Sequence, residues 1–147
     1  MTTEVGTKVA ARPRRFEVFE LKRIPDESGT LYAAEVAQHA GKQFERVFFI
    51  SNVPRGARRG GHAHRVQDEY LICVRGSVDV RIESLGEVTT IELKRPDVAL
   101  YLPASYWRDL LNFSPDAVLI VLALRAWSES DYIRDRSAFR RRGAELE

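Results

Sequence analysis

The chain has 147 residues, of which 44% are hydrophobic and 30% charged, and its formal net charge is +2 at pH 7. These values indicate one globular domain with a single core, and they argue against a disordered chain and a membrane-spanning chain. The small net charge gives no electrostatic reason for a nucleic-acid partner, so we expect neither nucleic acid nor a membrane as partner. A single cysteine and an N-terminus without an apolar signal segment predict a cytoplasmic protein.

In chain order, we expect a flexible leader at 1–14, one domain at 15–140 and a basic and acidic tail at 141–147. Short segments rich in Val, Ile, Leu, Phe and Tyr lie between turn-forming residues, and they predict strands at 16–21, 30–37, 46–51, 69–75, 77–82, 89–93, 99–102 and 118–124. Only the end of the chain indicates a helix, capped by Asp131 and continuing through Phe139. Many short strands without helices between them predict an all-β antiparallel sandwich or barrel with a short C-terminal helix.

Cysteine and histidine are the residue types that most often carry chemistry. Cys73 lies in an apolar run at 71–74 and is predicted to be a buried structural thiol, and His39 lies in a polar turn and is predicted at the surface. His62 and His64 are separated by one residue. On a strand, side chains at i and i+2 leave the same face about 6–7 Å apart, so the two imidazoles can converge on one ligand or one metal ion.

The spacing around this pair is more specific than the pair itself. Gly56 is followed by His62, His64, Glu69 and Gly76 at intervals that match every defining position of the first cupin motif. The chain therefore resembles the cupin superfamily. This resemblance implies a double-stranded β-helix, also called a jelly roll, closed into a small antiparallel barrel.

The second cupin motif is matched only in part. Pro103 and Asn112 agree with it, whereas Asp97 and Ser105 replace glycines and Arg108 stands where the last metal-binding histidine would be. A guanidinium has no lone pair to donate and stays protonated, so Arg108 cannot be a metal ligand. We therefore expect neither a metal nor a cofactor.

Three functions remain open from these residues alone. In a metal-free site, His62 or His64 can move a proton between carbons beside a carbonyl while Arg108 stabilises the enediolate, which predicts an isomerase. A metal-dependent cupin oxygenase would use His62, His64 and Glu69 as a two-histidine, one-carboxylate set. A non-catalytic cupin would bind a sugar or an anion with the same groups.

Longer stretches carry a closer resemblance. The runs at 59–65, 100–103 and 130–135 are similar to the sugar 3,4-ketoisomerases, and the similarity extends from about residue 16 to 139. The resemblance implies an enzyme that converts dTDP-4-keto-6-deoxyglucose to its 3-keto isomer through an enediolate, in the biosynthesis of deoxy amino sugars. It also implies a cytoplasmic, metal-free homodimer with exchanged N-terminal strands.

The resemblance makes His62 and His64 the catalytic pair, and the residues alone do not decide which of them is the base. The expected substrate contacts, from the resemblance and from side-chain chemistry, are Arg59, Arg108, Arg46, Trp107 and Glu69. Asp131 and Tyr132 are assigned to helix capping and packing. Phenylalanine in the segment 47–50 and serine in the turn 26–29 depart from the family pattern, and they leave the stereochemistry at C4 open.

Overall fold

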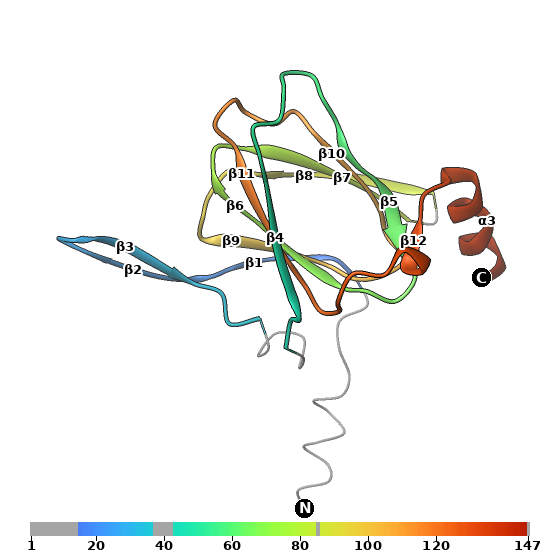
Figure 1. Cartoon of the computed structure of the whole chain (residues 1–147), viewed down its shortest axis with the longest axis horizontal. Helices are drawn as coiled ribbons and strands as arrows, with labels where there is room; N and C mark the ends of the chain where they lie inside the picture. The colour runs from blue at the N-terminus through green and yellow to red at the C-terminus, as the bar shows by residue number, and fades with distance from the viewer. Residues whose placement is uncertain (1–14, 37–42, 85, 147) are drawn as a thin grey trace, which may run out of the picture.

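The computed structural model describes residues 15–36, 43–84 and 86–146, so the predicted leader at 1–14 and His39 lie outside the described residues. The chain forms two five-stranded sheets, ordered β1-β9-β6-β11-β4 and β12-β5-β10-β7-β8, and a separate hairpin of β2 and β3. The two sheets face each other and enclose a barrel, and helix α3 lies beside β5 and β12 (Figure 1). The strands are β1 (Glu17–Glu20), β2 (Lys22–Asp26), β3 (Gly29–Ala33), β4 (Arg46–Ser51), β5 (Arg59–His64), β6 (Glu69–Arg75), β7 (Val78–Ser84), β8 (Glu87–Leu93), β9 (Val98–Leu102), β10 (Trp107–Leu111), β11 (Val118–Ala123) and β12 (Tyr132–Ile133).

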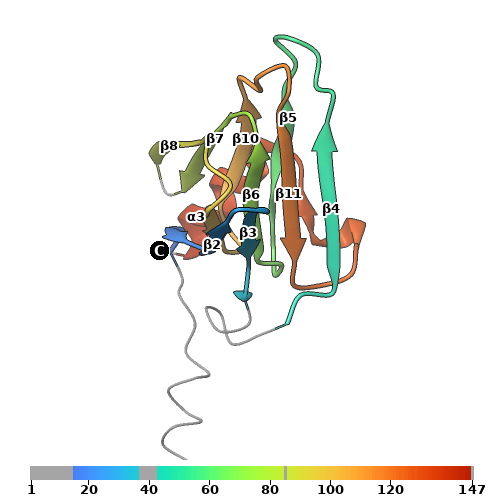
Figure 2. The same cartoon turned by 90° about the vertical axis from the view of Figure 1, so that its left-hand side faces the viewer.

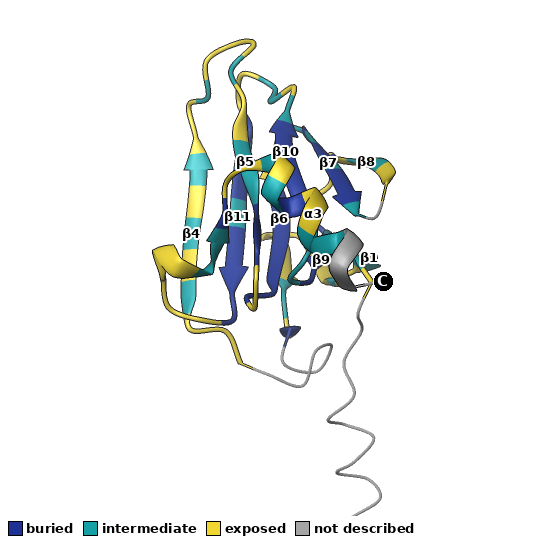
Figure 3. Cartoon of the chain, turned by 90° about the vertical axis from the view of Figure 1, so that its right-hand side faces the viewer, coloured by how far each residue is buried: buried dark blue, intermediate teal, exposed yellow. Residues whose placement is uncertain are grey.

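The main core lies between the two sheets. Along β7, Val78, Val80 and Ile82 are buried and point into the barrel, because alternate side chains of a strand leave opposite faces. They meet apolar side chains of the facing sheet, and Figure 3 shows these inner strands as the most buried part of the molecule. The buried members of this core are Leu71, Cys73, Val78, Val80, Ile82, Leu93, Leu100, Leu102, Leu110, Leu119 and Val121.

A second apolar cluster covers the outer face of the sheet that contains β6. Tyr70 and Ile72 point outward and pack with Tyr101, Leu122 and other side chains of this cluster. Strand β6 is therefore apolar on both faces, which explains its continuous apolar sequence. Cys73 is fully buried on the inner face, as predicted, and burial raises the pKa of its thiol.

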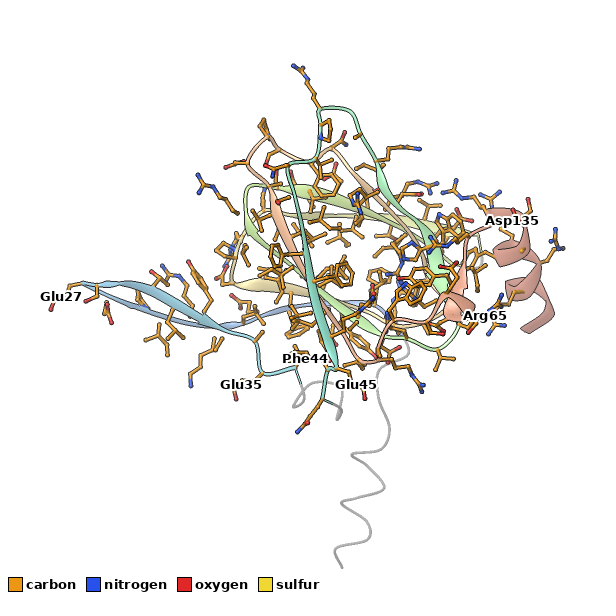
Figure 4. All side chains as sticks on the ribbon, viewed as in Figure 1. Glu27, Glu35, Phe44, Glu45, Arg65 and Asp135 are labelled. Carbon is orange, nitrogen blue, oxygen red and sulfur yellow. The ribbon has the colours of Figure 1, made fainter. Side chains whose placement is uncertain are left out.

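The β2–β3 hairpin projects away from the barrel as an arm (Figure 1). Asp26 closes its turn by accepting a hydrogen bond from the Ser28 backbone N–H at 2.7 Å, and Gly29 adopts φ +131°. The labelled Glu27 marks the tip of this arm in Figure 4. Strand β2 was not predicted from the sequence, because Pro25 interrupts it and no apolar alternation marks it.

The C-terminal helix differs from the prediction at both ends. Residues 129–131 form a short 3-10 helix, η1 (Glu129–Asp131), strand β12 follows it, and the helix α3 spans Arg136–Leu146. The predicted tail after residue 140 is therefore largely helical. The Asp135 carboxylate, rather than that of Asp131, accepts a hydrogen bond from the Ser137 backbone N–H at 3.1 Å and caps the helix.

Helix α3 is fixed to the barrel by one apolar and two ionic contacts. The Phe139 ring packs 5.7 Å from that of Trp107 on β10. Arg136 pairs with Asp109 at 2.5 Å, and Arg140 pairs with Glu83 at 2.8 Å. In the ranges that the structure describes, no helix is long and apolar enough to cross a membrane.

Candidate active site

A cavity of about 240 Å³ opens into the barrel between the edge strand β4 and the β5–β12 side. Figure 2 shows β4 beside β11 at the edge of its sheet, and Figure 4 shows side chains of facing strands converging in the barrel interior. The cavity wall is apolar on the β4, β6 and β11 side, apart from Glu69 on β6, and it carries cationic side chains on the β5 and β10 side. Its lining residues are Phe48, Ile50, Arg59, Gly60, His62, Glu69, Leu71, Arg108, Leu110, Val121, Tyr132 and Arg134.

His62 lines this cavity, and one of its ring nitrogens is held by the backbone of β5. Its Nδ1 lies 3.1 Å from the Gly60 carbonyl oxygen, which can only accept a hydrogen bond, so Nδ1 carries the proton. Burial, and then the charge of Arg108, lower the pKa of His62 to about 3. The imidazole is therefore neutral near pH 7, and Nε2 has a free lone pair.

His64 lies behind His62 and does not line the cavity. Its side chain is fully buried, with Nδ1 2.9 Å from Asp131 and Nε2 3.4 Å from Glu69, the latter without hydrogen-bond alignment. The two imidazole centroids are 4.9 Å apart. The predicted shared face is thus observed, but only one of the two rings reaches the cavity.

Glu69 and Arg108 form a buried ion pair in the cavity wall. Arg108 Nη1 lies 2.6 Å from Glu69 Oε1, and the side chains are 2% and 4% exposed. Burial alone would raise the pKa of Glu69, but the contact with His64 and the charge of Arg108 outweigh it and hold that pKa well below its usual range. The Nε of Arg108 is buried and has no hydrogen-bond partner among the described residues.

The histidine, carboxylate and arginine set does not fit a metal ion. One oxygen of Glu69 is bound by Arg108, and the other accepts a hydrogen bond from Gln67 at 3.0 Å. His64 Nδ1 is bound to Asp131. Within the described ranges, no group of three or more His, Cys, Asp or Glu side chains is arranged to hold a metal ion.

Gly60 allows β5 to approach β10 closely. A Cβ at this position would lie 2.9 Å from the Arg108 backbone oxygen, and the φ of Gly60 is +81°. Only glycine adopts such a conformation without strain. The same residue supplies the carbonyl oxygen that fixes the His62 ring, so the β5 backbone and the ring orientation depend on each other.

Two cavity residues, Tyr132 and Arg134, were not predicted as site residues, and Asp131, which lies outside the cavity wall, was assigned to helix capping. Asp131 accepts hydrogen bonds from His64 and from the Val66 backbone N–H at 2.8 Å, so it fixes the histidine rather than capping a helix. Tyr132 lines the cavity, and the Arg134 guanidinium lies 4.2 Å from the centroid of its ring. The 130–135 run was noted only for its family resemblance, and no local pattern places it beside residues 62 and 64.

Two predicted substrate contacts lie outside the cavity wall. Trp107 is 4% exposed and faces α3, because alternation along β10 turns Arg108 inward and Trp107 outward. Trp107 therefore does not line the cavity, and its contact with the substrate stays a prediction. Arg46 is half-buried over the ring of Phe48, a lining residue, and its Nε and Nη2 have no hydrogen-bond partner in the described part of the chain. Arg59 lines the cavity, and its predicted substrate contact stays a prediction.

A jelly-roll barrel with a neutral histidine and a buried arginine at its cavity defines a cupin-type enzyme. The sequence model of the family described as "FdtA: WxcM-like, C-terminal" matches residues 14–143, so the chain belongs to this family. This confirms the cupin fold and the predicted family.

Known relatives agree with this assignment. The chain is 33% identical over 125 residues, 85% of its length and 90% of the relative's, to the TDP-4-oxo-6-deoxy-α-D-glucose-3,4-oxoisomerase of Aneurinibacillus thermoaerophilus. The crystal structure of QdtA, a sugar 3,4-ketoisomerase from Thermoanaerobacterium thermosaccharolyticum in complex with TDP, superposes with a TM-score of 0.87 at 32% identity, covering 90% of this chain and 97% of QdtA. A 3,4-ketoisomerase from Helicobacter canadensis gives a TM-score of 0.84 at 29% identity, with 88% and 97% covered.

Proposed function

We propose that the protein converts a TDP-linked 4-keto-6-deoxyglucose to its 3-keto isomer. Relatives named for this reaction match nearly the whole chain, and a histidine-to-asparagine variant of QdtA has been solved with TDP-4-keto-6-deoxyglucose. The cavity supports the same chemistry in this chain, since it combines one unprotonated imidazole with cationic side chains. The substrate carries a diphosphate, which such a cationic mouth attracts.

The observation that carries this proposal is the His62 ring. Its Nδ1 is fixed by Gly60, so the free Nε2 lone pair is the basic atom on the cavity wall. His62 therefore removes the proton from C3 of the sugar. The negative charge that develops on the substrate favours the imidazolium form, and His62 then delivers the proton to C4.

His64 acts by positioning rather than by contact with the sugar. It is fully buried behind His62 and lies between Asp131 and Glu69. It thus connects β5 with the segment before β12 and with β6. The catalytic pair of the prediction becomes one base and one supporting residue.

Arg108 stabilises the enediolate. It lines the cavity, cannot exchange a proton at physiological pH, and has a buried Nε without a partner among the described residues. Glu69 holds its guanidinium in place through the 2.6 Å ion pair. Arg59, at the start of β5, and Arg46, at the start of β4, bind the diphosphate, one from the cavity wall and the other from beside it.

The active enzyme is a homodimer, cytoplasmic, in which the β2–β3 arm of each protomer packs on the other. An isolated two-stranded hairpin is barely stable in water, so the projecting arm needs a surface to pack against. Ile24 and Leu31 on the arm are 45% and 57% exposed, and Val47 and Phe49 on the outer face of β4 are 55% and 70% exposed. These two apolar surfaces fit an arm exchange between two copies.

The test is incubation of the purified protein with TDP-4-keto-6-deoxyglucose in deuterated water, followed by NMR. We expect a 3-keto product, with deuterium at C4 in the fraction of turnovers in which the protonated His62 exchanges with solvent before it delivers the proton. His62→Asn should lower the rate by about 10²–10⁴-fold, the usual contribution of a general base. Unchanged substrate with the wild-type protein, or full activity in His62→Asn, would contradict the proposal.

A further inference from the structure

The proposed isomerisation needs two proton transfers, and His62 performs only one of them. The hydrogen on C3 moves to C4, and the hydroxyl proton on the C3 oxygen must move to the C4 oxygen. After His62 has removed the C3 hydrogen, the intermediate has a hydroxyl at C3 and an oxyanion at C4. A second group must therefore exchange a proton between two neighbouring oxygens, and this inference rests on the proposed function.

The polar side chains of the cavity wall leave one candidate for this second group. Arg59, Arg108 and Arg134 do not release protons at physiological pH. Glu69 is tied to Arg108 and Gln67. His64, although close, does not line the cavity. Among the described lining residues, the hydroxyl of Tyr132 is the group that both donates and accepts a proton.

Tyr132 is held rigidly beside the base. Its backbone pairs with His64 across β12 and β5, and its ring centroid lies 4.8 Å from that of His62 and 4.5 Å from that of His64. The Arg134 guanidinium covers the ring, and Glu129 fixes that guanidinium with hydrogen bonds of 2.8 and 2.9 Å. No hydrogen bond joins the Tyr132 side chain to another described residue. Its hydroxyl is not one of the buried atoms that lack a partner, and the residue lines the cavity.

We propose that Tyr132 is a catalytic residue that carries the proton from the C3 oxygen to the C4 oxygen of the enediolate. The hydroxyl gives its proton to the C4 oxyanion and takes the proton of the C3 hydroxyl, so the tyrosine ends as it began. The oxyanion then lies at C3. Protonation of C4 by His62 next forms the C3 carbonyl and leaves the hydroxyl at C4. No oxidant, reductant or other reactant is needed.

Tyr132→Phe tests this role because it removes only the hydroxyl and keeps the ring against both histidines. In deuterated water, we expect formation of the 3-keto product to fall by about 10²–10⁴-fold. Exchange of the C3 hydrogen should continue within a few-fold of the wild-type rate, since His62 and Arg108 are unchanged. A high ratio of exchange to product formation is the specific signature, which a merely structural role of Tyr132 would not produce.

Tyr106→Phe is the matched control, because Tyr106 packs on Phe16 and does not line the cavity. It should leave both rates unchanged. Normal product formation in Tyr132→Phe would overturn the inference and indicate transfer through water or His62. Equal loss of exchange and product formation in a folded Tyr132→Phe, shown by an unchanged thermal melt, would also overturn it. If the wild-type protein itself shows neither rate, the proposed function fails instead.

Discussion

At the residue scale, burial and nearby charges leave His62 neutral and Glu69 ionised near pH 7. Burial and Arg108 lower the pKa of His62 to about 3, so the ring is a free base. Glu69 is more deeply buried, yet its contact with His64 and the Arg108 guanidinium hold its pKa below the usual range. The Arg108 guanidinium thus contributes both to keeping the base neutral and to keeping the carboxylate charged.

The lowered pKa of His62 predicts a loss of stability in acid. The unfolded state binds a proton near pH 6.5 and the folded state near pH 3, so the stabilisation is complete above pH 6.5 and decreases as the pH falls toward 3. Between pH 7.5 and 4.5, urea unfolding should show that the wild type loses about 2 kcal/mol more than His62→Asn. Glu69, whose pKa is lowered, adds a loss only below its ordinary 4.5. Parallel pH curves for the two proteins would contradict this assignment.

The Arg108–Glu69 pair should separate stability from activity. Arg108→Met leaves the Glu69 carboxylate buried without its partner, and we expect unfolding free energy to fall by about 3–5 kcal/mol. Arg108→Met combined with Glu69→Gln should recover most of that loss, because no buried charge is left unpaired. The isomerase rate of the double variant should stay at least about 10²-fold below wild type. A fully active double variant would show that Arg108 is only a structural partner of Glu69.

At the element scale, the site depends on how closely β5 approaches β10. Strand β5 pairs with β10 from Arg59 to His62, with a bulge opposite Arg108 and Asp109. Bulges and glycines in such a position direct side chains into a site. Two adjacent glycines lower the strand propensity of β5, so the sequence does not predict this strand. The same Gly60–Gly61 pair permits β5 to pair with β10.

Gly60→Ala and Gly61→Ala form a matched pair of variants for this strand. Both glycines have positive φ, +81° and +70°, and both substitutions should cost about 1–2 kcal/mol through backbone strain. At Gly60 the new Cβ also meets the Arg108 backbone oxygen at 2.9 Å, whereas at Gly61 no atom lies within 4 Å. Gly60→Ala should therefore lower both the melting temperature and the isomerase rate further than Gly61→Ala. Equal effects in the two variants would contradict a close-approach role for Gly60.

At the scale of the whole molecule, the proposed dimer rests on the exposed apolar surfaces of the arm and of β4. The arm extends away from the barrel (Figure 1), and its apolar side chains Ile24 and Leu31 are 45% and 57% exposed. A second copy supplies that cover in the proposed dimer. If an apolar residue of the arm were replaced by aspartate, the new carboxylate would be buried in the dimer interface.

Leu31→Asp should convert the dimer to a monomer in sedimentation at micromolar concentration. Burying an unpaired carboxylate at the interface is strongly unfavourable. Val88→Asp is the control, since Val88 is similarly exposed, at 50% against 57%, but lies on β8. The wild type and Val88→Asp should sediment at twice the 16.8 kDa chain mass. A monomeric wild type, or a dimeric Leu31→Asp, would contradict the arm exchange.

The sequence by itself predicted the all-β class, most strands, the buried thiol and the inward positions of His62, Glu69 and Arg108. These features depend on local alternation and on motif spacing, which are properties of neighbouring residues. Four strands were missed: β2 contains a proline, β5 contains two glycines, β10 has two charged residues at its centre, and β12 has only two residues.

Only the tertiary structure decided which groups meet at the site. Spacing places His62 and His64 on one face. It cannot show that Asp131, 67 residues after His64, forms a hydrogen bond with it, or that Tyr132 lines the cavity. Side chains alternate along β10, but only the barrel shows which of the two faces points inward. Arg108 lies on the inward face and Trp107 on the outward face. The physical reason is that a site in a jelly roll is built from strands distant in sequence. Their register is set by long-range pairing, and no local pattern encodes it.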